Sequence, residues 1–281
     1  MRLRDYGSGS TAPGESTRFG IKARIAAVGL FLVFLLGTGI TFFVKGESGL
    51  VPTDSVTLCP TKRPPSKIVV ILLDVSDQFS EPQRLQIQNH LARVRDSIPR
   101  FGLVELYSVD RLGRRVTEHV THLCNPGAGD DLSQIYQNPE LARRKWQGFA
   151  KKLTSDIDQQ MSAKRMGTSP IFEAIQATAL RTFGKAEYDG LPKHLVIVSD
   201  LMQNVPGGLS MYRETPPFDK FKNTPYFSRI RGDLSGVSIL IYYLVRSNAP
   251  KQSPEHLGFW RDYFRFQGAE IESVDRVFGD K

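Results

Sequence analysis

Cysteine is scarce in this chain of 281 residues, which has only Cys59 and Cys124. Two cysteines exclude a cysteine-rich zinc framework or a disulfide-dense mini-scaffold, so any fold must rest on apolar packing. A long basic run is also lacking, although the formal net charge is +8. We therefore expect no nucleic-acid binding and a mixed, solvated surface. Hydrophobic residues make up 40% of the chain, enough for a folded core.

The motifs of several enzyme classes are absent as well. The sequence has no glycine-rich phosphate loop, no Gly-x-Ser-x-Gly elbow and no Cys/His pair at catalytic spacing. Asp74-Val-Ser76 has serine where aspartate-nucleophile phosphatases place a second aspartate. We expect a protein that is not an enzyme, and keep a metal-dependent hydrolase or phosphatase as an alternative.

The histidines show no spacing typical of metal ligands, and we interpret all of them as structural or solvent-facing. His119 and His122 in particular are interpreted as alternating along an edge strand rather than facing one ion. The five are His90, His119, His122, His194 and His256.

One uncharged, mostly apolar stretch is long enough to cross a bilayer as a helix, residues 25–44. A cleaved signal peptide is disfavoured because Phe42-Phe43-Val44-Lys45 offers no small-x-small cleavage site. Positive charges are concentrated in the flexible tail 1–24, so the positive-inside rule places that tail in the cytoplasm. We expect a single-pass membrane protein, anchored in a bacterial inner membrane, with its C-terminal part in the periplasm.

A proline-containing spacer, residues 45–66, separates this stretch from one domain over residues 67–281. Cys59 lies in the spacer and Cys124 follows the third expected strand. An extracytoplasmic domain with two cysteines could bridge them or keep two free thiols, and both alternatives stay open.

The hydrophobic pattern predicts an α/β domain. Buried-type apolar runs alternate with amphipathic stretches that begin at Ser80, Asn138, Pro170 and Ser253. This order predicts a doubly wound, mostly parallel six-stranded sheet with helices on both faces. A hairpin of the second and third strands supplies one antiparallel edge strand. Strands are expected at 67–74, 103–110, 115–123, 194–199, 237–245 and 270–277, and a short helix within 218–229.

Acidic and hydroxyl side chains follow three of these elements. Asp74 and Ser76 end the first strand, Asp200 ends the fourth, and Thr168 precedes a helix. Ligands of doubly wound sheets bind at the carboxyl ends of the strands. If the two strands are neighbours, these oxygens converge on one rim, and such oxygens are what a hard cation prefers. Each could equally cap a turn or a helix; Thr168 or Ser169 could cap the helix that Pro170 starts.

The pattern resembles the von Willebrand factor A (integrin I-like) domain. Asp74-Val-Ser76, Gly167-Thr168-Ser169-Pro170-Ile171 and Ser199-Asp200 stand at the matching topological positions. The resemblance implies a metal-ion-dependent adhesion site of Asp74, Ser76, Thr168 and Asp200 that holds Mg²⁺, Mn²⁺ or Ca²⁺. Gln78 stands where that family has its second serine, and Asp77 and Ser169 are further candidate ligands.

Together these features predict a membrane-anchored protein-binding module. A protein partner in an envelope complex would contact the metal edge and the long loop 201–236. A scaffold of the same fold without a metal is the alternative, with Gln78 as its main support. The tripeptide Arg231-Gly232-Asp233 is given no role, because three residues recur by chance.

Overall fold

The computed structural model describes residues 51–109, 119–129, 138–162, 167–246 and 251–279. The expected tail 1–24 and membrane span 25–44 lie outside the described residues. Among the residues that are described, no helix combines the length and hydropathy needed to cross a membrane. The chain separates into two compact units, and the larger one begins at Pro52. The remainder of the description concerns this larger unit.

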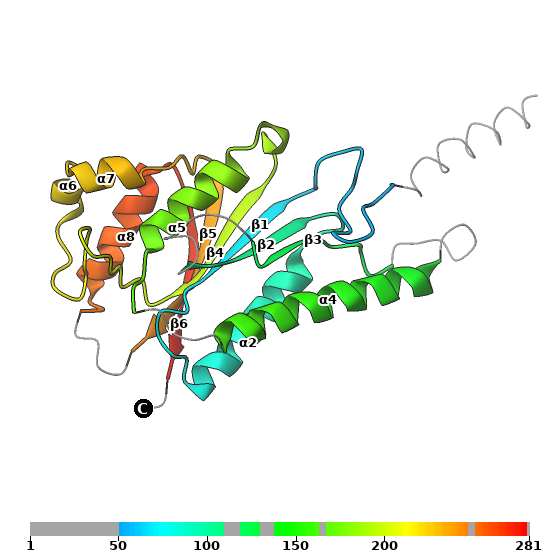
Figure 1. The fold of residues 1–281 in the computed structure, drawn as a ribbon, viewed down its shortest axis with the longest axis horizontal. Coiled ribbons are helices and arrows are strands. Elements are labelled where there is room, and N and C mark those ends of the chain that lie inside the picture. Colours follow the sequence, from blue (N-terminus) through cyan, green and yellow to red (C-terminus); the bar gives the residue numbers. More distant parts are fainter. Residues whose placement is uncertain (1–50, 110–118, 130–137, 163–166, 247–250, 280–281) are drawn as a thin grey trace, which may run out of the picture. The chain divides into compact units, whose positions relative to one another are not determined.

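Six strands form a single sheet in the order β3-β2-β1-β4-β5-β6 (Figure 1). All neighbouring pairs are parallel except β2 and β3, which are antiparallel. The prediction of a mostly parallel six-stranded sheet with one antiparallel edge strand is therefore confirmed. The strands are β1 (Ile68–Leu73), β2 (Leu103–Ser108), β3 (Thr121–Cys124), β4 (Lys193–Ser199), β5 (Val237–Val245) and β6 (Glu270–Phe278).

Helices cover both faces of the sheet, so its central strands are buried on both sides (Figure 1). All six residues of β1 are buried, as expected for a central parallel strand. One face carries α2 (Glu81–Ser97) and α4 (Pro139–Met161). The other carries α5 (Ile171–Thr178), continued by the π-helical turn η1 (Ala179–Phe183) and the 3₁₀ turn η2 (Ala186–Tyr188), and then α6 (Phe218–Phe221), α7 (Pro225–Ile230) and α8 (Pro254–Phe266).

The helix starts follow their sequence signals with one exception. Ser80 and Gln83 form the expected capping box of α2, and Asn138 and Ser253 cap α4 and α8. The expectation that Thr168 or Ser169 caps the next helix was wrong, because Pro170 is the N-cap of α5 and provides no side-chain cap. The Ser169 hydroxyl is used elsewhere, at the rim described below.

Two segments differ from the expected elements. The third strand was expected over 115–123, whereas β3 is Thr121–Cys124, and residues 110–118 lie outside the described ones. The single short helix expected within 218–229 is two helices, α6 and α7. Phe218, Phe221 and Phe227 are buried against α8, so this part of the long loop packs as a layer of the core.

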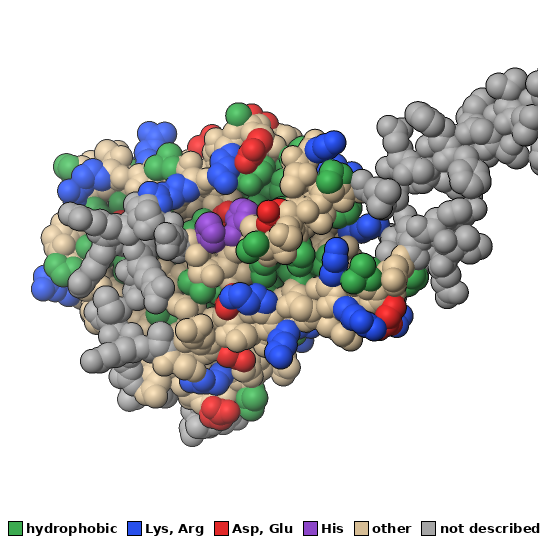
Figure 2. Space-filling view, turned by 45° about the vertical axis from the view of Figure 1, so that its right-hand side comes forward, with side chains coloured by type: hydrophobic (Ala, Val, Ile, Leu, Met, Phe, Trp, Pro, Cys, Tyr) green, Lys and Arg blue, Asp and Glu red, His purple; other side chains and the backbone are tan. Residues whose placement is uncertain are grey.

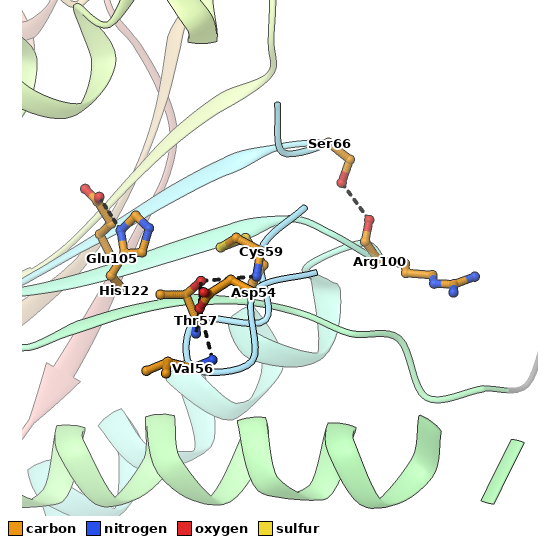
Figure 3. Close-up of a disulfide and its surroundings, with 9 residues drawn as sticks. Asp54, Val56, Thr57, Cys59, Ser66, Arg100, Glu105 and His122 are labelled. Carbon is orange, nitrogen blue, oxygen red and sulfur yellow. Dashed lines mark hydrogen bonds and ion pairs between the residues drawn. A yellow bond between two sulfur atoms is a disulfide. The ribbon is translucent and has the colours of Figure 1, made fainter. Parts of the chain in front are cut away.

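A strap formed by residues 52–61 lies along the edge strand. Cys59 and Cys124 form a disulfide, and the Cys124 amide donates a hydrogen bond to the Thr57 carbonyl at 2.8 Å. Thr53 and Pro60 pair with each other, so the strap doubles back on itself. Figure 3 shows this loop beside the end of β3, with Asp54 accepting hydrogen bonds from Val56 and Thr57.

Candidate functional site at the carboxyl ends of β1 and β4

The strand order brings the two expected aspartates to one rim of the sheet. β1 and β4 are parallel neighbours, with Leu73 opposite Val198, and the Asp74 amide donates to the Val198 carbonyl at 2.9 Å. Asp74 is 3% exposed and Asp200 is 2% exposed. Two carboxyl groups are thus removed from water at the point where ligands of such sheets bind.

Asp74 ties three segments together through its carboxylate. The hydroxyls of Ser169 and Ser199 donate to Oδ2 at 2.9 and 2.7 Å. The Ser76 amide donates to Oδ1 at 3.0 Å. Both oxygens of this buried carboxylate are therefore satisfied by the protein, as a buried charge requires. Ser199 was not among the expected site residues, although its place at the end of a buried strand was a usable signal.

Asp200 is held by an arginine that the sequence analysis did not connect with it. Arg246 directly follows β5, and its Nε donates to Asp200 Oδ2 at 3.1 Å. The same guanidinium donates to the Gln78 carbonyl at 2.8 Å and lies 3.8 Å from an oxygen of Asp77. The Met202 amide donates to the other oxygen of Asp200 at 2.9 Å. One side chain thus links the loops that follow β1, β4 and β5.

The electrostatic balance at Asp200 favours its neutral form relative to an exposed aspartate. Burial and the nearby Asp74 raise the pKa of Asp200 to about 6, against the opposing effect of Arg246. Two buried carboxyl groups close together cannot both ionise at ordinary cost, and one arginine offsets only part of that repulsion.

Beside the rim lies a pocket of about 320 Å³. Four of the expected site residues line it: Ser76, Asp77, Thr168 and Ser169. Gly167, Asn204 and Tyr212 complete the lining, and the Tyr212 hydroxyl donates to Asp77 at 3.2 Å. Asp74 and Asp200 do not line this pocket, but Ser169, which donates to Asp74, does. Gln78 contributes its backbone carbonyl, through the bond from Arg246.

The backbone directly after Asp200 adopts an uncommon conformation. Leu201 has a φ of 58° although it is not glycine, and it is completely buried. Its carbonyl accepts a hydrogen bond from Trp260 Nε1 and lies 3.0 Å from His256 Nε2. Burial lowers the pKa of His256, so the ring is neutral, with Nε2 donating to Leu201 and Nδ1 accepting from the Tyr243 hydroxyl. Strain of this kind persists only where the surroundings enforce it.

The expected Mg²⁺, Mn²⁺ or Ca²⁺ does not fit this arrangement of side chains. The donor types are right, since carboxylate and hydroxyl oxygens suit hard cations. However, the permanently charged guanidinium of Arg246 lies against Asp200, and it would repel a divalent ion there. Arg246 supplies the positive charge that a metal would otherwise provide.

A second polar cluster lies on the antiparallel edge of the sheet, and here the expectation that His119 and His122 alternate along an edge strand rather than facing one ion was wrong. Glu105, His119 and His122 place ligand atoms within 4.8 Å of one another. His119 precedes β3, so the alternation assumed along a strand does not apply to it. Histidine side chains gather beside acidic ones on the face shown in Figure 2. The overlooked signal was Glu105, a charged residue in the middle of an otherwise apolar strand.

Comparison with known proteins finds similarity of structure only. No protein-family model matches the chain, and no curated protein matches it. An aerotolerance-related membrane protein from Bacteroides fragilis is 13% identical, with 75% of this chain and 91% of that chain covered and a TM-score of 0.36. The conserved hypothetical protein BatB from Bacteroides thetaiotaomicron is 14% identical over 76% and 91%, with a TM-score of 0.33. The manganese-loaded TRAP protein of Plasmodium vivax is 12% identical over 76% and 68%, with a TM-score of 0.37. Likenesses this weak carry no argument about the site, which rests on the geometry above.

Proposed function

We propose that this chain is a membrane-anchored, extracytoplasmic binding module that holds a protein partner at the rim formed by Asp74, Asp77, Asp200 and Arg246. Residues 25–44 anchor it in the bilayer, and the loop 201–236 forms part of the binding surface. The rim works without Mg²⁺, with Arg246 in the cation's place. This is the metal-free alternative of the sequence analysis, extended by an assigned counter-charge.

The contact between Arg246 and Asp200 is the observation that carries this proposal. A guanidinium is always charged and forms directed hydrogen bonds, so it can organise carboxylates and carbonyls in a fixed geometry. Here it joins Asp200, Gln78 and Asp77, which lie on two different loops. The result is a preorganised rim, and preorganisation lowers the entropic cost of binding a partner.

The disulfide supports the extracytoplasmic side of the proposal. Disulfides persist in oxidising compartments and are rare where glutathione and thioredoxin keep thiols reduced. The bond between Cys59 and Cys124 ties the strap to the edge strand. The basic residues that precede residues 25–44 predict the same orientation.

Binding rather than catalysis is favoured by the state of the carboxylates. A general base or nucleophile must present an oxygen to substrate, but both oxygens of Asp74 are held by the chain's own donors. Around the pocket, Tyr212 is 49% exposed beside Asp77, a suitable anchor for a protein partner.

Site-specific photocrosslinking tests the proposal. A photoreactive benzoylphenylalanine replaces Tyr212 in the full-length chain in its native membranes, and the matched control carries it at Leu85, an exposed residue of α2. We expect one protein adduct from position 212, none from position 85, and the same yield with and without EDTA. Adducts of equal yield at both positions would contradict the binding surface. Loss of the adduct in EDTA that excess Mg²⁺ restores and Zn²⁺ does not would show that the rim depends on a metal after all.

A further inference from the structure

We propose that Glu105, His119 and His122 form a binding site for one divalent transition-metal ion, separate from the aspartate rim. Two of the three residues lie on adjacent strands, with Glu105 of β2 directly opposite His122 of β3. Strand-borne ligands have little freedom to drift, which is what a metal site needs. The inference does not depend on the proposed function, because no residue of the rim contributes to it.

The distances suit an ion held between the carboxylate and the two rings. Glu105 Oε1 lies 2.9 Å from His122 Nδ1, and Figure 3 shows the two side chains facing each other. With an ion about 2.1 Å from both atoms, the angle between them at the metal would be about 90°, so a tetrahedral ion requires the two ligand atoms to move apart by about half an ångström. Such an ion takes the place of the proton between these atoms, and the proton leaves to solvent. The His119 and His122 rings are 4.9 Å apart, and the exposed His119 can complete the set by a side-chain rotation.

The surroundings of Glu105 resemble the outer partners that hold a metal ligand in place. Glu105 is only 2% exposed, and its second oxygen accepts hydrogen bonds from the hydroxyls of Tyr107 and Thr182. These donors fix the carboxylate and leave its first oxygen directed at His122. Partners of this kind are a regular feature of metal sites. An ion pair between Glu105 and His122 alone would not require the second imidazole beside it.

The donor set indicates the class of metal. Imidazole nitrogens suit Zn²⁺, Cu²⁺, Ni²⁺ and Fe²⁺, whereas Mg²⁺ and Ca²⁺ prefer oxygen alone. Two imidazoles with one carboxylate leave coordination positions for water on the exposed side of His119. An ion bound there would therefore be accessible to solvent. It also sits on the strand that the disulfide fixes, because Cys124 is two residues after His122.

Zinc titration of the untagged full-length chain tests this site. After treatment with a chelator and its removal, we expect calorimetry to show one Zn²⁺ bound, and excess Mg²⁺ not to displace it. His119→Ala should weaken Zn²⁺ binding by about a hundredfold or more, since it removes a ligand. The matched control is His194→Ala, a histidine near Glu272 on the opposite part of the sheet, which should bind Zn²⁺ like the wild type.

His122→Ala is a poor test of metal binding, because it also removes one hydrogen-bond partner of the buried Glu105 carboxylate and could destabilise the fold. His119→Ala avoids this problem, since His119 is at the surface. A second measurement is the melting temperature, which Zn²⁺ should raise in the wild type and in His194→Ala but not in His119→Ala. A wild-type chain that takes up no Zn²⁺ would overturn the proposal. Unchanged Zn²⁺ affinity in His119→Ala would do so as well.

Discussion

The aspartate rim and the histidine edge solve the same problem, a buried carboxylate, in opposite ways. At the rim, Asp200 is matched by Arg246, a permanent charge contributed by the residue that follows β5. At the edge, Glu105 is matched by His122 and two hydroxyls, all neutral or titratable groups. A fixed internal cation closes a site to metals, whereas a titratable partner can give way to one. The donor atoms that suit a metal ion are therefore grouped at the edge of the sheet, where the sequence did not suggest a metal site.

The pKa values of the two carboxyl groups express this difference. Burial and Asp74 raise the pKa of Asp200 to about 6. Burial also opposes ionisation of Glu105, but hydrogen bonds from His122, Thr182 and Tyr107 outweigh it, and the pKa of Glu105 is lowered. At the rim, repulsion from Asp74 therefore disfavours the ionised form of Asp200, whereas at the edge the hydrogen bonds favour the ionised form of Glu105.

The largest expected effect on stability comes from the disulfide that ties the strap to the edge strand β3. Cys59 and Cys124 are 65 residues apart in sequence, and a cross-link over that separation restricts the unfolded chain by about 4 kcal/mol in the loop-entropy model. We expect Cys59→Ser with Cys124→Ser to lower the free energy of unfolding by that amount, measured by urea denaturation of the full-length chain. Denaturing thiol titration of the unreduced wild type should find no reactive thiol. Two reactive thiols would contradict the bridge.

Removal of the fixed charge at the rim should have the next largest effect. Arg246→Met leaves Asp200 buried beside Asp74 with no counter-charge, and we expect a loss of about 3 kcal/mol in the free energy of unfolding. Adding Asp200→Asn to this variant should recover most of the loss, because it removes the stranded charge. Urea denaturation of both variants measures the difference. Equal stability of the single and double variants would mean that Arg246 does not neutralise the rim.

The same arginine variant tests whether Arg246 is what prevents a divalent ion from binding at the rim. With Arg246→Met we expect weak Mg²⁺ or Mn²⁺ binding to appear at the rim, since the repelling guanidinium is gone while the oxygens remain. Calorimetry with each ion compares it with the wild type, in which we expect no heat from this site. The control is Arg246→Met with Asp74→Ala, which should abolish the new binding. Strong Mg²⁺ binding by the wild type would refute the role of Arg246.

Two neighbouring hydroxyl residues of the rim, Ser169 and Thr168, should differ in how much they contribute to stability. Ser169→Ala should cost about 1.5 kcal/mol of stability, because its hydroxyl donates to the buried Asp74 carboxylate. Thr168→Ala, at the neighbouring position, should change stability by less than about 0.5 kcal/mol, since Thr168 makes no hydrogen bond within the described residues. Thermal and urea unfolding compare the two. A larger loss at Thr168 would indicate that this side chain has a structural role.

The last expected effect, at most about 3 kcal/mol, is a pH dependence of opposite sign at the two clusters. Asp200 has a raised pKa, so its contribution to stability is present below the unfolded value of 3.8 and is lost as pH rises through about 6. Glu105 has a lowered pKa, so its contribution is present above its unfolded value of 4.5 and is lost as pH falls through its folded pKa. Unfolding with EDTA present, compared between wild type, Asp200→Asn and Glu105→Gln, should give difference curves of opposite slope. Slopes of the same sign would contradict the contrast.

The sequence sufficed for elements whose signals are local. The capping box of Ser80 and Gln83, the apolar run of β1 and the acidic ends of β1 and β4 all follow from neighbouring residues. Arg246 was missed because its partner is 46 residues away, although a charge at the end of a buried strand was visible. The edge cluster was missed for a different reason. The third strand was expected to include His119, so its side chain was assumed to alternate with that of His122. His119 lies before β3, where this alternation does not apply.

The hydrogen bond from Trp260 to Leu201 gives the molecule a built-in optical reporter. The indole donates to the carbonyl of the residue that follows Asp200, and its ring stacks on Phe172. Any ligand that shifts the backbone after β4 must alter the polarity around this indole and hence its fluorescence. The chain's other tryptophan, Trp146, lies on α4, across the sheet from the core that contains Trp260. Emission from Trp260 in a Trp146→Phe background would therefore register occupancy of the rim without any label.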